Sequence, residues 1–103
     1  MLLRHATPLR NLLSIQRYGL LCAKSQGRLK VVWLATKENS RWAALHVVER
    51  HGGRIEAVVT LEVDVPRSWL RRSRKGLWHC TRDIAAARVL RLFGFVELAR
   101  VTG

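Results

Sequence analysis

The sequence predicts an α+β fold, a single small domain in which a mixed, mostly antiparallel sheet carries two helices. Three observations lead to this prediction. The chain has 103 residues, which suffices for one domain and not for two. Its residues are 49% hydrophobic, so a buried core is possible and disorder is not expected. Along the chain, apolar stretches typical of strands alternate with two amphipathic stretches typical of helices.

The first predicted helix begins at Pro8, because Thr7 is a good N-cap and proline fits the first helical position. Gly19 is expected to end this helix, since glycine commonly follows the last helical turn. One stripe of the helix should be buried, while its charged residues face solvent. The members of the buried stripe are Leu9, Leu12, Leu13 and Gln16.

The second predicted helix covers residues 41–51. Asn39 or Ser40 is expected to cap its start, and the pair Gly52 and Gly53 follows its end. Apolar residues recur along this segment at the spacing of a helix with one buried face. The buried stripe is expected to consist of Trp42, Ala44, Leu45 and Val48.

Five strands are predicted, over residues 1–5, 30–36, 54–65, 76–80 and 90–101. The strand over 54–65 is the clearest, because apolar and polar residues alternate along it. The strand over 30–36 contains the continuous apolar run Val31, Val32, Trp33 and Leu34, which favours burial on both faces. Gly94 marks a bulge or bend in the last strand. Asp83 is expected to cap a helical turn that runs to Ala87.

The charge of the chain is strongly unbalanced, with 19 Lys and Arg against 7 Asp and Glu, a net charge of +12. This excess favours a polyanionic partner, namely nucleic acid, a phosphorylated ligand or an anionic membrane surface. A solvated basic surface without a specific partner is the alternative. Basic residues are dense over 68–75, a segment that is expected to be a loop or a short helix.

Cysteine usage and N-terminal charge bear on the compartment. Cys22 and Cys80 form no metal-binding spacing with the histidines, so no metal is expected and both thiols should be reduced, as in a cytoplasmic protein. No apolar run reaches the ~18 residues that span a membrane. A mitochondrial targeting peptide is the alternative, because seven Lys or Arg precede the first acidic residue, Glu38. Against it, the predicted strand over 30–36 lies in the same acid-free region.

Residues 4–21, RHATPLRNLLSIQRYGLL, resemble the opening strand and helix of the ADP-ribosyltransferase superfamily. The matching residues are His5, Ala6, Thr7, Asn11, Leu12, Ser14, Ile15, Gly19 and Leu20. The stretch VVWLAT, residues 31–36, is similar to the second strand of that fold. The segment RRSRKGLWHCTRDI, residues 71–84, contains a run that is similar to the RNA 2′-phosphotransferases, a branch of the same superfamily. That run consists of Arg72, Ser73, Gly76, Leu77 and Trp78.

The resemblance implies an ADP-ribosyltransferase-like fold with a site for NAD, which serves as a substrate in this superfamily. It implies that His5 and Arg72 are the catalytic residues. His5 would hold the ribose, and Arg72 would pair with a phosphate, whose oxygens match the planar fork of a guanidinium. The residues that bind NAD would come from the first two strands. They are Ala6, Thr7, Trp33, Leu34 and Ala35.

The chain also departs from the family pattern. Trp33 stands where the phosphotransferases have a histidine, and Ala6 stands where a glycine is usual. The N-terminal lobe of those enzymes has no counterpart, and the glutamate of the protein-modifying branch cannot be placed. These differences leave two possibilities open, a divergent transferase or an inactive protein that binds NAD or a phosphorylated RNA end.

A basic nucleic-acid-binding module without catalysis is the alternative function, with RNA as the expected partner. Arg71, Arg74 and Lys75 would then contact backbone phosphates. Trp69 would stack on a base, and His79 would lie near the same site. A small interaction protein with a basic surface is a third possibility. Dependence on NAD separates the first function from the other two.

Overall fold

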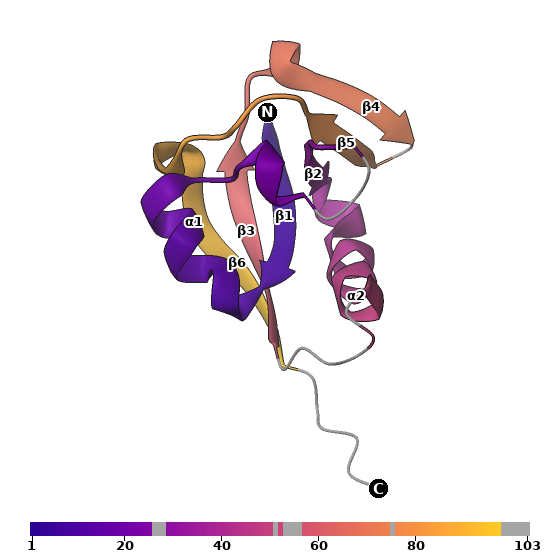
Figure 1. The fold of residues 1–103 in the computed structure, drawn as a ribbon. Helices are drawn as coiled ribbons and strands as arrows, with labels where there is room; N and C mark the ends of the chain where they lie inside the picture. The colour runs from indigo at the N-terminus through magenta and orange to yellow at the C-terminus, as the bar shows by residue number, and fades with distance from the viewer. Residues whose placement is uncertain (26–28, 51, 53–56, 75, 98–103) are drawn as a thin grey trace, which may run out of the picture.

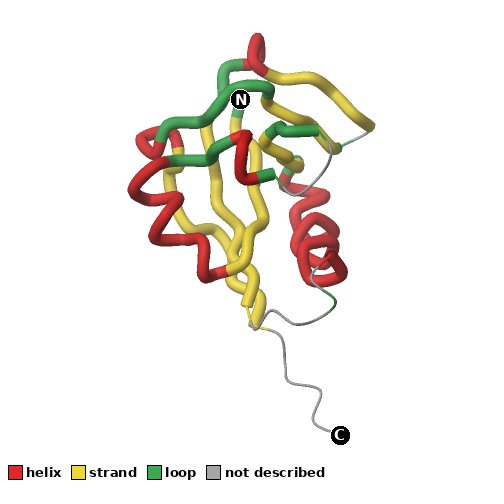
Figure 2. The backbone as a smooth tube through the Cα atoms, viewed as in Figure 1, coloured by secondary structure: helices red, strands yellow, loops and turns green. Residues whose placement is uncertain are grey.

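A six-stranded antiparallel sheet forms the centre of the fold and separates two helices (Figures 1 and 2). The structure is a computed structural model that describes residues 1–25, 29–50, 52, 57–74 and 76–97. Its strand order is β4-β5-β2-β1-β3-β6. The strands are β1 (Leu2–Pro8), β2 (Val32–Ala35), β3 (Ala57–Asp64), β4 (Leu70–Arg74), β5 (Leu77–Cys80) and β6 (Val89–Glu97). The helices are α1 (Leu12–Tyr18) and α2 (Ser40–Arg50).

The two helices cover opposite faces of this sheet. Alternate residues of a strand point to opposite faces, so one strand can contribute to two clusters. On one face, Ile15 of α1 belongs to a core cluster with Leu3 of β1 and Leu61 of β3. On the other face, Ala44 of α2 packs against Val58 of β3. The predicted α+β domain, with two helices and a mostly antiparallel sheet, is therefore confirmed.

The five predicted strands are confirmed as β1, β2, β3, β5 and β6, although residues 54–56 and 98–101 lie outside the described residues. The first five residues of β3 are all buried, because helices cover both faces of the sheet there. The alternation of apolar and polar residues along β3 therefore does not correspond to one buried face and one face exposed to solvent. Gly94 pairs with Thr60 next to a shift in register, which confirms the predicted irregularity in the last strand.

The first strand is longer than predicted, and this changes the start of the first helix. The pairing of β1 with β3 includes Thr7 and Pro8, so Thr7 is not an N-cap and Pro8 is not helical. A 3-10 turn over Leu9–Asn11 follows, and α1 begins at Leu12. β1 pairs with β2 at Arg4 and not beyond it, so one side of β1 is an edge there. An edge is the setting in which a strand tolerates proline.

Each helix buries only part of its predicted stripe, namely Leu12 in α1 and Ala44 and Val48 in α2. Five of the predicted core residues are exposed: Leu9, Leu13, Gln16, Trp42 and Leu45. The residues that pack against the sheet are Leu12, Ile15, Ala44, Val47 and Val48. Each helix carries apolar residues on more than one stripe. Periodicity therefore predicts the helices correctly but does not decide which stripe meets the sheet.

Within the basic segment 68–75, residues 70–74 form a strand rather than a loop or short helix, and Lys75 lies outside the described residues. A 3-10 turn over Arg67–Trp69 leads into β4, which lies at the edge of the sheet. Four of the five β4 residues are exposed, so the sequence of this strand lacks the alternation of apolar and polar residues that would predict it. Asp83 does not cap a helical turn either. Its carboxylate instead accepts a hydrogen bond from the backbone N–H of Cys22 at 2.7 Å.

The predictions on the cysteines, on metal binding and on membrane-spanning segments can be compared with the described residues. Cys22 and Cys80 are both free thiols in the structure. Among the described residues, no group of three or more His, Cys, Asp or Glu could hold a metal ion. In the same part of the chain, no helix has both the length and the apolar character needed to cross a membrane.

Candidate functional site

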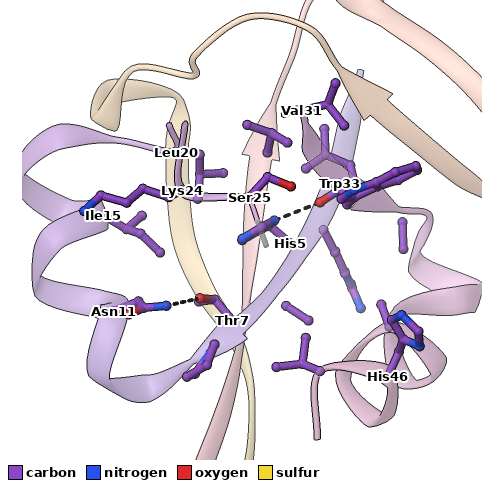
Figure 3. A pocket seen from close by; sticks show the side chains of 18 of the residues that line it. His5, Thr7, Asn11, Ile15, Leu20, Lys24, Ser25, Val31, Trp33 and His46 are labelled. Atoms are coloured by element: carbon purple, nitrogen blue, oxygen red, sulfur yellow. Dashed lines mark hydrogen bonds between the residues drawn. The ribbon is translucent and has the colours of Figure 1, made fainter. Parts of the chain in front are cut away.

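A cavity of about 550 Å³ lies where β1 and β2 separate (Figure 3). These strands pair at a single position, Arg4 opposite Ala35, whereas β1 pairs with β3 along its whole length. Residues of α1 line the cavity from one side and residues of α2 from the other. A volume of this size suits a small-molecule ligand. Where neighbouring strands separate, their backbone N–H and C=O groups no longer pair with each other and can bond a side chain or a ligand instead.

His5 is the histidine that β1 directs toward this cavity. Its Nδ1 lies 2.8 Å from the carbonyl oxygen of Trp33 in β2, and a dashed line in Figure 3 marks this hydrogen bond. A carbonyl oxygen only accepts hydrogen bonds, so Nδ1 carries the proton and donates. In the neutral ring, Nε2 is then left as an acceptor. The contact with Trp33 thus fixes both the orientation and the tautomer of the imidazole.

Burial sets the charge of this imidazole. Removal from water lowers the pKa of His5 below its ordinary value of 6.5, and the hydrogen bond to the Trp33 carbonyl raises it by a smaller amount. The net effect favours the neutral ring. A neutral imidazole is a hydrogen-bond acceptor for a hydroxyl group rather than a cation for a phosphate.

The lowered pKa of His5 predicts a pH dependence of stability. Below about pH 6.5 the unfolded chain binds a proton at this position and the folded chain does not, so stability falls as the pH falls. The slope attributable to one such group is at most about 1.4 kcal/mol per pH unit. In urea unfolding between pH 7.5 and 5.5, His5→Gln should lose less stability than the wild type. Equal losses in the two proteins would contradict a neutral, half-buried His5.

A second polar group of the cavity comes from the end of β1. Thr7 is buried, and its hydroxyl oxygen accepts a hydrogen bond from the side-chain amide of Asn11 at 3.1 Å (Figure 3). This bond uses the oxygen as an acceptor and leaves the hydroxyl hydrogen to donate. His5 and Thr7 point to the same face of β1, because they are two residues apart. The cavity therefore offers one acceptor and one donor on this face.

The lining of the cavity is cationic. Its charged members are Arg4, Arg10, Lys24, Arg50 and Arg74. No Asp or Glu occurs among the described residues that line it. These side chains come from β1, from the turns before and after α1, from α2 and from β4. Positive charge therefore reaches the gap from several elements of the fold. A concave site lined by one sign of charge concentrates ligands of the opposite sign, which here means anions.

The structure places seven of the predicted site residues around this cavity. They are His5, Ala6, Thr7, Trp33, Leu34, Ala35 and Arg74. Four others do not line it: Trp69, Arg71, Arg72 and His79. Lys75 lies outside the described residues. The structure therefore brings together the residues of the first two strands and one arginine of β4.

His5 and Arg72 do not meet at this cavity, and the pairing of β4 with β5 explains why. Arg72 lies opposite Trp78, and its guanidinium is 5.9 Å from the centre of that ring. A bulge follows Arg72, and Arg74 then lies opposite Leu77. The extra residue in the bulge turns Arg74 to the other face of the sheet, toward the cavity. The cation that β4 supplies to this site is therefore Arg74.

Trp69 and His79 have partners elsewhere. Two guanidinium groups lie over the Trp69 ring, that of Arg88 at 4.9 Å and that of Arg82 at 5.3 Å from its centre. A nucleobase that stacked on this ring would compete with those cations. The His79 ring lies edge-on to Trp33 at 5.3 Å, and its Nδ1 is 2.9 Å from the Ser73 hydroxyl. His79 therefore packs against Trp33 and does not line the cavity.

The sequence prediction missed the contribution of α2 to the site. Trp42, His46 and Arg50 line the cavity, and they are spaced four residues apart on one side of the helix. The Trp42 and His46 rings are stacked, with centres 5.2 Å apart and planes 10° apart. This spacing is visible in the sequence, but the sequence pattern places Trp42 in the buried stripe of the helix, whereas the structure exposes it. A polar residue four positions after a tryptophan was the signal for an exposed stripe.

Comparisons with protein families, with curated proteins and with solved structures give no significant match to the chain. The relationship to the ADP-ribosyltransferases therefore stays a prediction from the sequence segments 4–21, 31–36 and 71–84.

Proposed function

We propose that the cavity between β1 and β2 binds NAD or the phosphorylated end of an RNA. The chain would then be a divergent ADP-ribosyltransferase-like protein, similar to the RNA 2′-phosphotransferases. One observation carries this proposal. The half-buried His5, kept neutral by its surroundings, lines the same cavity as five cationic side chains. The neutral imidazole suits a ribose hydroxyl, and the cationic side chains suit phosphates.

In this proposal, His5 accepts a hydrogen bond from a ribose hydroxyl through Nε2. The bond from Nδ1 to the Trp33 carbonyl supports this role, because it holds the acceptor in place before the ligand arrives. Thr7 lies two residues further along β1 and has a hydroxyl hydrogen to donate. The cavity volume of about 550 Å³ is also in the range of nucleotide-sized ligands.

The residue that binds the phosphate in this proposal is Arg74 rather than Arg72. Arg74 is a member of the cavity lining, whereas Arg72 lies over Trp78. Arg10 and Lys24 line the cavity as well. A guanidinium can bind two oxygens of one phosphate at once, so Arg74 can fix the direction of a pyrophosphate as well as its charge.

Binding is the activity that we assign to the cavity. Transfer of ADP-ribose to an acceptor is served in the protein-modifying branch of the resembled superfamily by a glutamate. No carboxylate occurs among the described lining residues. A transfer reaction at this cavity would therefore have to proceed with imidazole, hydroxyl and cationic groups.

Calorimetric titration tests this function. The wild-type chain should bind NAD, or an RNA oligonucleotide that ends in a phosphate, saturably and with one site per chain. His5→Gln should weaken that binding about 3- to 10-fold, the scale of one neutral hydrogen bond. Glutamine can still donate to the Trp33 carbonyl, but its acceptor is a flexible amide oxygen that no ring holds at the position of the histidine Nε2. Absence of binding by the wild type, or an unchanged affinity of the variant, would contradict the proposal.

Nucleic-acid binding along β4 is the second candidate function. β4 is an edge strand, and Arg71, Arg72 and Arg74 are all exposed on it. Exposed arginines spaced along an extended strand can contact successive phosphates. Binding of this kind weakens steeply with salt, and replacing all three arginines by alanine should flatten that dependence. A salt dependence that the triple substitution leaves unchanged would exclude this function for β4.

A further inference from the structure

A smaller cavity adjoins the one between β1 and β2. Its volume is about 210 Å³, and its lining residues are Asn39, Trp42, Arg74, Gly76 and Leu77. The two cavities share the lining residues Trp42, Arg74 and Leu77, so they are adjacent. A ligand that extends past Arg74 from the main cavity would reach the smaller one.

Trp42 has the features of a stacking surface. Trp42 is 47% exposed, whereas most of the surface of a tryptophan is usually buried. Contacts along α2 nevertheless hold the ring. It stacks on His46, and Nη2 of Arg50 lies 3.3 Å from Nε2 of His46. An exposed aromatic ring that is held in one orientation by its neighbours is what a flat ligand group requires.

Asn39 supplies polar groups beside this ring. Its side-chain Nδ2 donates one hydrogen bond to the Thr36 hydroxyl at 3.1 Å. The second hydrogen of that amide and its oxygen are left for a ligand. An asparagine amide pairs with adenine through one donor and one acceptor, N6–H and N7. The same edge of guanine presents two acceptors, O6 and N7, of which the amide can satisfy only one.

We propose that the smaller cavity takes the base of the bound nucleotide, with adenine preferred. The base stacks on Trp42, Asn39 pairs with its edge, and Arg74 meets the phosphates at the boundary with the main cavity. This inference rests on the proposed function, because it takes the ligand to be a nucleotide. It goes beyond that function by assigning the base to α2 and by naming the residue that selects it.

Binding of ADP, GDP and ribose 5-phosphate by calorimetry tests the inference. Trp42→Ala should weaken ADP binding about 5- to 100-fold, the scale of one lost base–aromatic stack, and leave ribose 5-phosphate binding unchanged. Trp42→Phe should restore most of the loss. Asn39→Ala should bring the affinities for ADP and GDP closer together. Leu45→Ala is the matched control, since Leu45 is 48% exposed on the same helix but lines neither cavity.

The outcomes separate the inference from the function on which it rests. If the wild type binds ADP and Trp42→Ala binds it equally well, the base does not stack on Trp42 and the inference is overturned. Equal losses for ADP and ribose 5-phosphate would overturn it too, because they would indicate a damaged fold or a phosphate effect. If the wild type binds none of the three ligands, the proposed nucleotide-binding function itself fails.

Discussion

Arg74→Ala is expected to weaken binding of a pyrophosphate-containing nucleotide about 10- to 150-fold, the equivalent of about 1.5–3 kcal/mol. The loss is large because a guanidinium–phosphate contact is a charge-assisted hydrogen bond, which is about twice as strong as a neutral one. Arg74 is the cation of β4 that lines the main cavity, and it lines the smaller cavity as well. Calorimetric titration with ADP or NAD measures the change.

Arg72→Ala is the matched control for this substitution. It removes the same type of side chain from the same strand, and Arg72 is also exposed. Its guanidinium lies over Trp78 and outside both cavities. We therefore expect a change of less than twofold. A loss in Arg72→Ala as large as that in Arg74→Ala would show that general positive charge, and not the position set by the bulge, governs binding.

Gly19→Ala is expected to destabilise the fold by about 2–4 kcal/mol. Gly19 ends α1 as predicted, with φ at 81° and its N–H bonded to the Ile15 carbonyl at 2.8 Å. An added Cβ would be strained at this φ and would collide with the backbone carbonyl of Ile84. That carbonyl is also bonded to the N–H of Leu20 at 2.8 Å, so the collision disturbs a contact that joins α1 to the distant segment around Ile84.

Gly52→Ala separates the cost of backbone strain from the cost of collision. Gly52 also has a positive φ, 63°, but an added Cβ would meet nothing within 4 Å. Its replacement should therefore cost only the strain, about 1–2 kcal/mol. Urea unfolding of the wild type and both variants measures the three free energies. If Gly52→Ala is as destabilising as Gly19→Ala, the close approach at Ile84 does not contribute.

Most of the fold could be predicted because its signals are local. Runs of apolar residues and turn-forming glycines were sufficient for five strands and two helices. The edge strand β4 was missed because its residues, from Leu70 to Arg74, carry almost no apolar signal. An edge strand pairs with one neighbour and can be nearly all polar. The start of α1 was misplaced because Thr7 and Pro8 are equally compatible with the end of a strand beside a gap.

The candidate site could be predicted only in part. His5, Thr7 and Trp33 were identified from segments whose order resembles a known superfamily, and all three line the cavity. Arg74 could not be preferred over Arg72, because the difference depends on a bulge that the sequence does not reveal. The helical contribution depends on which stripe of α2 meets the sheet. Packing against β3 decides which stripe it is. Because β3 lies far from this stripe in the sequence, the local sequence pattern of α2 does not reveal it.

Amide chemical-shift mapping of the ¹⁵N-labelled chain during titration with NAD is the most direct test of nucleotide binding between β1 and β2. We predict that the largest shifts fall on Ala6 and Thr7 of β1 and on Trp33 to Ala35 of β2, which line the cavity. Residues of β6, which lie at the opposite edge of the sheet from β4, should shift little. Shifts confined to Leu70–Arg74, or no shifts at saturating NAD, would contradict the account.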